Sequence, residues 1–319
     1  MTDGILTLWL IGDGKPGHEN QSLGLAEAMA RRVACEIHRI SIAGKRSVTG
    51  RIRVAMAQGA KLPKPDFIIA AGHATHFPLL WLARKYRARS IVLMRPSLPL
   101  SWFGLCIAPS HDFPKNTTRK NLILTRGAIN RVRPSDSDKT GKLILIGGPS
   151  KTHGWDDAAM LNILKAITAT GDWQLTDSRR TPEGFLEQIK KHLPNIEIFS
   201  CLETPPDWLP SKLREAGEAW VSEDSVSMIY EALSSGARVG LLPVPRLKAE
   251  SRALRGIDSL VAEGFLTPLV TWDAWRYIAS APEALSEADR CASIILEMNT
   301  RMDFVLSPSL PPDMMEVDN

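Results

Sequence analysis

Short apolar runs alternate with segments of helical period along the whole chain. In the first half, these runs predict strands at residues 5–11, 36–41, 67–71, 90–94, 104–108 and 121–125. In the second half, they predict strands at 142–147, 173–176, 196–199, 218–222, 238–242 and 266–270, with helical segments from about 273 to 305 after the last one. Strands that alternate with helices are typical of a parallel sheet wrapped by helices. We therefore expect an α/β protein with two tandem, Rossmann-like, doubly wound domains.

Two of the intervening segments show a clear apolar face. Apolar residues spaced three or four positions apart predict one buried face in each helix. In the first helix this face is formed by Leu23, Ala26, Ala30 and Val33, and in the second by Met160, Ile163, Leu164 and Ile167.

The polar stretch 131–141, RVRPSDSDKTG, interrupts this alternation and predicts a linker. We expect a first domain at 1–138, a second at 139–272, C-terminal helices at 273–306 and a disordered tail at 307–319, which is rich in proline and acidic residues. Ligands of doubly wound sheets bind beyond the carboxyl ends of the strands. The cleft between the domains is therefore the expected site.

The charge is divided unevenly between these halves. The net charge of the 319 residues is +4, but residues 1–138 contain 21 basic and 9 acidic side chains, and residues 139–319 contain 18 and 26. This asymmetry indicates that the first domain faces an anionic partner, which we do not expect to be a nucleic acid. Four widely separated cysteines and the lack of an 18-residue apolar run favour a cytoplasmic protein, with peripheral contact at the inner membrane face left open.

The first predicted strand leads into a glycine-rich turn, GDGKPGHENQS, at residues 12–22. This turn matches G-x-G-x-x-G, but the second strand, 36–41, ends without the acidic residue that a nicotinamide site requires. The turn places His18 beside a helix N-terminus, where free backbone N–H groups bind anions. A surface histidine with no role in binding is the alternative.

A second turn, GHATHFP at residues 72–78, follows the third strand. His73 and His76 have no further metal ligand nearby, so we expect no metal site. The segment 79–89 joins an apolar cluster to four cations. Such a basic amphipathic helix can lie on an anionic bilayer, or it can be an ordinary helix with a solvated basic end.

Polar groups also follow the strands of the second half. After 142–147, Gly147, Gly148, Ser150 and Lys151 predict an oxyanion cradle. After 173–176, Arg179 and Arg180 can bind phosphate bidentately, or can be solvated surface residues.

The segment SEDSVSMIYEA at 222–232 predicts a helix capped by Asp224 or Ser225 and ended by Gly236. Its outward face carries Ser227 and Glu231. Phosphate at Ser225 and Ser227, with ribose hydroxyls on Glu231, would suit the positive end of this helix. The alternative is a capped amphipathic helix with an exposed glutamate.

The turns GDGKPGHENQS, GGPS and DSRRTP, together with SEDSVSMIYEA, resemble the bacterial relatives of plant mitochondrial-fission proteins. That family is regarded as nucleotide-sugar glycosyltransferases and was earlier labelled a sugar epimerase. The layout also looks like GT-B glycosyltransferases such as the peptidoglycan lipid-intermediate N-acetylglucosaminyltransferase. The resemblance spans roughly residues 8–244.

The resemblance implies roles for these residues. His18 would be the catalytic base, with Asp13 and Glu19 as alternatives, on acceptor-side loops that include Gly14, Lys15, Gly17, Asn20, Gly72 and His73. The loop at Gly147 and the helix glutamate Glu231 would bind the donor. Two departures are the sequence Gly72-His73-Ala74 and the lack of a base-recognition signature around 201–209.

The implied reaction is transfer of a hexosyl or N-acetylhexosaminyl group from a UDP-sugar to a saccharide or lipid-linked acceptor, such as lipopolysaccharide core. The resemblance implies no cofactor and no essential metal. An epimerase of the same layout and a non-catalytic membrane-remodelling protein are the alternatives.

Overall fold

The protein forms two compact units. The computed structural model describes residues 4–135, 139–205, 207–248, 251–283 and 285–300. The first unit contains the described residues up to Arg131 and again from Glu287 onward, and the second contains those from Val132 to Ser286. Each unit is an α/β layer structure built on one six-stranded parallel sheet. The fold class expected from the sequence is confirmed.

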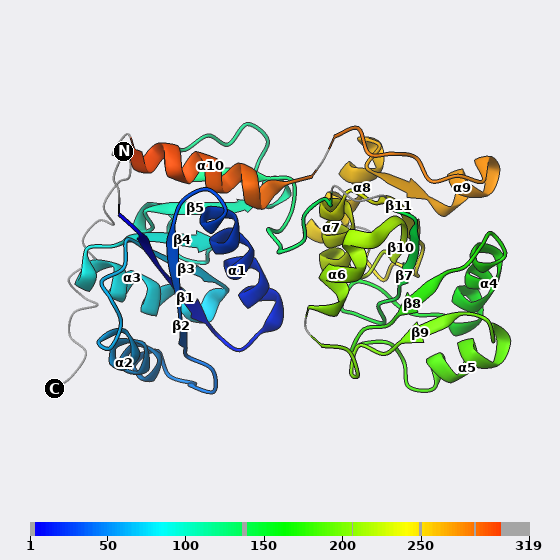
Figure 1. The fold of residues 1–319 in the computed structure, drawn as a ribbon, viewed down its shortest axis with the longest axis horizontal. Coiled ribbons are helices and arrows are strands. Elements are labelled where there is room, and N and C mark those ends of the chain that lie inside the picture. Colours follow the sequence, from blue (N-terminus) through cyan, green and yellow to red (C-terminus); the bar gives the residue numbers. More distant parts are fainter. Residues whose placement is uncertain (1–3, 136–138, 206, 249–250, 284, 301–319) are drawn as a thin grey trace. The chain divides into compact units, whose positions relative to one another are not determined.

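The sheet of the first unit has the strand order β2-β1-β3-β4-β5-β6 (Figure 1). Its strands are β1 (Leu6–Gly12), β2 (Cys35–Ser41), β3 (Phe67–Ala71), β4 (Arg89–Leu93), β5 (Leu105–Pro109) and β6 (Leu122–Thr125). Its helices are α1 (Pro16–Ala30), α2 (Val48–Gly59), α3 (His76–Tyr86) and α10 (Glu287–Thr300), with short 3-10 turns η1 (His73–Thr75), η2 (Leu100–Trp102) and η3 (Ser110–Asp112).

Helices cover both faces of this sheet. Leu8 and Leu10 of β1 pack in one apolar cluster with α1 and α10, whereas Trp9 and Ile11 pack in another with α2 and α3. Successive side chains of a strand point to opposite faces, so a strand buried on both faces needs apolar residues at every position. This requirement explains the unbroken apolar runs of the sequence.

The sheet of the second unit has the order β12-β11-β10-β7-β8-β9. Its strands are β7 (Gly141–Leu145), β8 (Gln174–Thr176), β9 (Glu197–Phe199), β10 (Ala216–Ser222), β11 (Arg238–Leu242) and β12 (Leu266–Pro268). Its helices are α4 (Asp157–Thr168), α5 (Phe185–His192), α6 (Trp208–Glu215), α7 (Val226–Ser235), α8 (Arg252–Ala262) and α9 (Leu269–Trp275). Across the described part of the chain, no helix has the length and apolar character needed to cross a membrane.

Each sheet has one point at which the direction of winding reverses. In the first unit the chain moves outward from β1 to β2 and then, on the other side of β1, from β3 to β6. In the second unit the reversal lies between β7 and β10. Loops that follow the strands at such a point diverge to opposite faces and leave a crevice for ligands. Within each unit the fold therefore brings two turns together: those after β1 and β3 in the first unit, and those after β7 and β10 in the second.

All twelve predicted strands are present, and none of their ends differs from the prediction by more than two residues. The strand predicted at 266–270 is too long, because Leu269 already begins α9. The apolar face predicted for α1 is right at Leu23 and Ala26, which contact the core, and wrong at Ala30 and Val33, which are exposed. Its buried residues are Ser22, Gly24, Leu25, Ala26, Ala28 and Met29. This surface is broad because α1 packs against both the sheet and α10.

The units divide the chain differently from the expected domains. Contacts place the boundary between Arg131 and Val132, seven residues before the expected one at 138/139. The helices expected at 273–306 belong to two units: α9 stays with the second, and α10 returns to the first. Cys291 and Ile295 of α10 are fully buried in the cluster that contains α1. The predicted tail at 307–319 lies outside the described residues.

Gly240 allows one large core side chain to pack over β11. It pairs with Trp220 on β10, and a Cβ atom at Gly240 would lie 2.4 Å from Cε3 of that fully buried indole. Overpacking a core of this kind costs about 1–3 kcal/mol. We expect Gly240→Ala to lower the free energy of unfolding by that amount in chemical denaturation. Gly17→Ala, where an added Cβ meets nothing within 4 Å, is the control and should not be destabilised. Equal stability of the two variants would contradict this packing.

Candidate functional site

The turn after β1 holds a histidine–carboxylate pair. Nδ1 of His18, in the first turn of α1, lies 3.1 and 3.0 Å from the two carboxylate oxygens of Asp13. The Asp13 side chain is only 4% exposed, and it also accepts a hydrogen bond of 3.2 Å from the backbone N–H of Lys15. Because a carboxylate only accepts hydrogen bonds, Nδ1 must carry the proton. In the tautomer that this contact favours, Nε2 carries the lone pair that a general base needs, and no hydrogen-bond partner of Nε2 is found among the described residues.

Glycine at position 72 allows His18 to approach the turn after β3. A Cβ atom at Gly72 would lie 2.2 Å from Nδ1 of His18, and the φ angle of Gly72 is +89°. Both the close contact and the left-handed backbone favour glycine. The two turns at the winding reversal of the first sheet are thus in contact, which brings His18 and Gly72 together as the sequence analysis grouped them.

Glu19, proposed as an alternative base, holds the turn in shape instead. Its Oε1 accepts a 3.0 Å hydrogen bond from the N–H of Gly14. A Cβ atom at Gly12 would lie 2.6 Å from the same oxygen, so glycine makes room for this carboxylate. Glu19 therefore positions the loop, and Asp13 positions the imidazole.

The remaining residues of this loop differ in their surroundings. Gly14 has a φ of +83° and lies against Ala43, and the Lys15 side chain is 69% exposed. Gly17 is exposed and Asn20 is half-buried. Lys15 lies 3.8 Å from the Asp13 carboxylate. Gly14 and Lys15 thus shape and charge the border of the His18 site.

His73 contacts a serine that the sequence analysis did not consider. Its Nδ1 lies 2.5 Å from Oγ of Ser97, which follows β4, and that hydroxyl is also 3.4 Å from Nδ1 of His76. Burial, together with the neighbouring His73, lowers the pKa of His76 to about 4, so this ring is neutral at physiological pH. Ser97 could have been identified from its position after the carboxyl end of a parallel strand.

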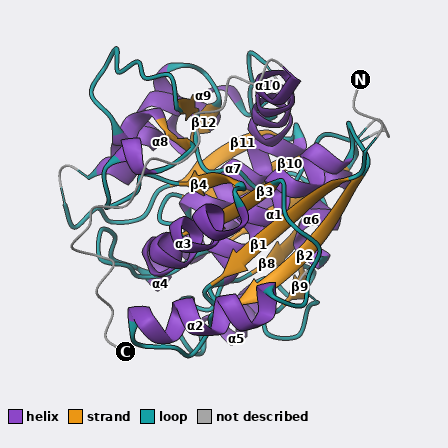
Figure 2. Cartoon of the chain, turned by 90° about the vertical axis from the view of Figure 1, so that its left-hand side faces the viewer, coloured by secondary structure: helices purple, strands orange, loops and turns teal. Residues whose placement is uncertain are grey.

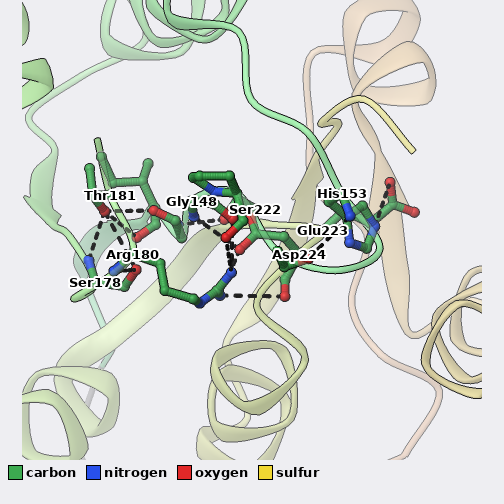
Figure 3. Close-up of polar contacts among 12 residues, drawn as sticks. Gly148, His153, Ser178, Arg180, Thr181, Ser222, Glu223 and Asp224 are labelled. Atoms are coloured by element: carbon green, nitrogen blue, oxygen red, sulfur yellow. Dashed lines mark hydrogen bonds and ion pairs between the residues drawn. The ribbon is translucent and has the colours of Figure 1, made fainter. Parts of the chain in front are cut away.

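In the second unit, the turn after β7 is bound to the end of β10. The N–H of Gly147 donates to Oγ of Ser222 at 2.7 Å, and the N–H of Gly148 donates to Asp224 at 3.0 Å (Figure 3). The Asp224 side chain is fully buried. These two amides are therefore not free to cradle an anion, which corrects the expectation from the GGPS turn. Asp224 does not cap α7 either, because its carboxylate binds the glycine turn.

Arg180 completes this cluster. It forms an ion pair of 2.7 Å with Asp224 and donates a 2.8 Å hydrogen bond to the carbonyl of Gly148. Figure 3 shows its guanidinium lying between the glycine turn and Asp224. With about two-fifths of its side chain exposed, Arg180 still presents positive charge at the surface. Its first role, however, is to neutralise a buried carboxylate, since an unpaired buried charge is strongly destabilising.

The neighbouring donors of the same loops are more exposed. Lys151 and Arg179 are both exposed, and no hydrogen bond or ion pair of their side chains is found among the described residues. Ser150 accepts hydrogen bonds through Oγ from the N–H groups of Thr152 and His153, at 3.2 and 3.1 Å. Lys151 and Arg179 are thus available to an anion, whereas Ser150 stabilises its own loop.

The helix α7 follows the prediction closely. Ile229, Tyr230 and Leu233 are buried, and Gly236 ends the helix with a φ of +79°. Ser225 is the buried N-cap residue and Ser227 is exposed.

Glu231 lies one turn beyond Ser227 and is half-buried. Desolvation raises the pKa of Glu231 to about 7. Within the described ranges, its carboxylate has neither a hydrogen-bond nor an ion-pair partner, so its oxygens remain free to accept hydrogen bonds from a ligand.

A second charged group lies at the end of β10, and the sequence analysis missed it. Glu223 accepts hydrogen bonds from Nε of Arg246, at 2.8 Å, and from a terminal nitrogen of the same guanidinium, which also binds Asp258 of α8 at 2.7 Å. The Nε2 of His153, which is buried and has no hydrogen-bond partner, is 3.9 Å from Glu223. Burial lowers the pKa of His153. The signal that could have found this group is again position, because Arg246 follows the end of β11.

The two units therefore offer different chemistry at their winding reversals. The first presents an oriented imidazole with a free nitrogen, and the second presents exposed cations, a helix N-terminus and an unpartnered carboxylate. Within the described ranges, no three His, Cys, Asp or Glu side chains are grouped as metal ligands.

Solved structures share this two-unit fold at low sequence identity. A protein from Listeria monocytogenes assigned as a UDP-N-acetylglucosamine 2-epimerase aligns with a TM-score of 0.61 and 13% identity, over 94% of this chain and 97% of its own. MurG of Acinetobacter baumannii aligns with a TM-score of 0.54 and 11% identity, over 92% and 100%. The glycotransferase of kitacinnamycin aligns with a TM-score of 0.54 and 15% identity, over 92% and 99%. The chain thus has the GT-B fold.

A search of curated protein sequences finds no significant match. A family model, in contrast, matches residues 16–298, a range that contains His18 and the candidate region of the second unit but begins after Asp13 and β1. The model is described as Mitochondrial fission ELM1, and the chain belongs to that family.

Proposed function

We propose that this protein is a glycosyltransferase that moves a sugar from a nucleoside diphosphate, UDP in the first instance, to an acceptor hydroxyl. The observation that carries the proposal is the His18–Asp13 pair at the winding reversal of the first sheet, in which the carboxylate orients the imidazole through Nδ1 and leaves Nε2 for a substrate. Family membership and the fold shared with an epimerase of UDP-N-acetylglucosamine and with a glycotransferase support the substrate class.

On the acceptor side, Nε2 of His18 would take the proton of the attacking hydroxyl as the bond to the anomeric carbon forms. Asp13 stabilises the imidazolium that results, because its carboxylate accepts the Nδ1–H bond. The acceptor that we propose is a saccharide or a lipid-linked saccharide such as lipopolysaccharide core. Lys15, at the border of this site, would favour an acceptor that carries negative charge.

On the donor side, the N-terminus of α7 and the exposed cations Lys151 and Arg179 would bind the diphosphate. A helix N-terminus offers free N–H groups and partial positive charge to an anion. The same charges stabilise the departing nucleoside diphosphate. Glu231 would accept hydrogen bonds from the ribose hydroxyls.

A sugar-nucleotide epimerase is the second candidate, and the Listeria monocytogenes structure favours it. An epimerase converts the donor alone, whereas a transferase needs a second substrate. Incubation with UDP-N-acetylglucosamine alone separates the two: accumulation of an epimeric UDP-sugar without release of UDP would replace the proposed function by this one.

UDP should raise the unfolding temperature, since a ligand at 100 times its Kd adds about 2.7 kcal/mol to the stability of the folded state. Glu231→Ala should weaken UDP binding about tenfold or more in titration calorimetry, because the ribose loses its acceptor. Glu187→Ala, an exposed carboxylate of α5, is the control and should bind like the wild type. If no nucleoside diphosphate shifts the melting curve, the donor site is wrong.

Glu231 should also make stability depend on pH. Its ordinary pKa is near 4.5 and its folded-state pKa is about 7, so between these values the folded protein holds a proton that the unfolded chain releases. The free energy of unfolding therefore falls as the pH rises through this window. Glu231→Gln has no carboxyl group to ionise, so it avoids this loss of stability at high pH. It should be about 1–3 kcal/mol more stable than the wild type at pH 8, with a smaller difference at pH 5. The measurement is urea denaturation at both pH values, and a constant difference would contradict the desolvated carboxylate.

His18→Ala should bind UDP normally and lose transfer by a factor of about 10²–10⁴, the usual contribution of a general base. Asp13→Asn should lower transfer too, because it no longer fixes the imidazole tautomer. The assay is UDP release from UDP-N-acetylglucosamine in the presence of a bacterial lipid extract. His38→Ala, a histidine 3.6 Å from Glu36 on β2, is the matched control. Full turnover in His18→Ala would remove this residue from the mechanism.

A further inference from the structure

The helices on one face of the first sheet carry an uncompensated positive charge. Between residues 37 and 111 the chain has twelve Lys and Arg residues and one acidic residue, Asp66. Asp66 is already engaged, because its carboxylate accepts a 2.8 Å hydrogen bond from the N–H of Thr7 at the start of the sheet. The positive charge of this segment is therefore not balanced by its own acids.

Six of these twelve cations are exposed on or just beyond two neighbouring helices. α2 and α3 contact each other and pack on the same face of the sheet through the cluster of Trp9, Ala55 and Leu79. Figure 2 looks toward this side of the unit, with α3 in front of the strands and α2 below it. We call the surface formed by six exposed side chains on and just beyond these helices the cationic helix layer. These side chains are Arg53, Lys61, Lys64, Arg84, Lys85 and Arg87.

Local structure accounts for only part of this charge. Arg84 and Lys85 lie in the last turn of α3, where cations interact favourably with the helix dipole. Arg53 is in the body of α2, and Lys61 and Lys64 follow that helix. In the part of the chain that the structure describes, none of the six side chains forms an ion pair. Their mutual repulsion is thus a cost that a bound anionic surface would remove.

The burial of α3 decides how such a surface would be bound. Its leucines at 79, 80 and 82 are in the core, so this helix cannot insert an apolar face into a bilayer. Trp81 is half-buried and lies one turn before Arg84 and Lys85, on the same side of the helix. Tryptophan beside cations suits the headgroup level of a membrane. Contact would therefore be electrostatic, with no deep insertion.

We propose that the cationic helix layer binds the surface of an anionic phospholipid bilayer. Lysine and arginine side chains near such a surface are attracted individually, and cations spread over two adjacent helices match a surface whose charge is also spread in a plane. This inference does not depend on the proposed glycosyl transfer, because the layer contains none of the residues assigned to the acceptor or the donor.

The experiment is co-sedimentation of the full chain with vesicles of phosphatidylcholine containing 30% phosphatidylglycerol, compared with pure phosphatidylcholine. We expect binding to the anionic vesicles only, weakened by raising the salt from 0.05 to 0.5 M, because salt screens exposed charges. The triple variant Arg84→Glu, Lys85→Glu, Arg87→Glu should lose at least tenfold in partition coefficient.

Two controls make the result specific. Lys190→Glu with Lys191→Glu reverses two exposed cations in the last turn of α5 and should bind like the wild type. An unfolding temperature equal to that of the wild type would show that the triple variant folds. The proposal is overturned if the wild type does not bind anionic vesicles at low salt, if both sets of variants bind equally, or if duplex DNA competes the protein off the vesicles at equal phosphate. Loss of vesicle binding with intact UDP binding would leave the proposed function unaffected.

Discussion

The reversal of winding in each parallel sheet is the constraint on which the candidate sites depend. In a parallel sheet, consecutive strands are joined by helices that cross one face, so the loops after neighbouring strands normally turn to the same face. In the two sheets that the structure describes, the β1/β3 and β7/β10 neighbours are the exceptions, because their loops turn to opposite faces. The contact of His18 with Gly72 and the bond between Gly148 and Asp224 occur at these two places.

Each reversal contains a buried aspartate, but the two aspartates act differently. Asp13 accepts a hydrogen bond from Nδ1 of His18, so its charge orients a reactive group. Asp224 accepts a hydrogen bond from Gly148 and pairs with Arg180, and so ties three loops of the second unit together. A rigid turn of this kind can hold neighbouring exposed donors in place. Glu231, in contrast, has no hydrogen-bond or ion-pair partner among the described residues.

The sequence was sufficient to locate the strands. It was insufficient to predict which distant residues and helices contact one another. Interior strands such as β1 and β3 are buried on both faces and leave an unbroken apolar run. The edge strands β2 and β9 are less buried, but their shorter apolar runs were still enough to locate them. The return of α10 to the first unit could not be predicted in this way, because it depends on contacts between α1 and a helix more than 250 residues away. Asp224 shows the same limit of prediction from sequence. An aspartate just before a helix is typical of a helix cap, but in the three-dimensional fold its carboxylate accepts a hydrogen bond from Gly148 instead. His18 was identified because a glycine-rich turn before a helix has a local signal.

The charge distribution bears on the choice between a transferase and an epimerase. An epimerase acts on one soluble sugar nucleotide, whose negative charge would be met by cations near the donor residues. The largest excess of cations instead lies in the other unit, on α2 and α3, where no residue assigned to the donor is found. Such an excess destabilises the folded unit by repulsion, and it is therefore retained more readily where an anionic partner relieves it. A transferase that takes its acceptor from a charged membrane surface has a use for both the oriented base and this layer, whereas an epimerase has a use only for the base.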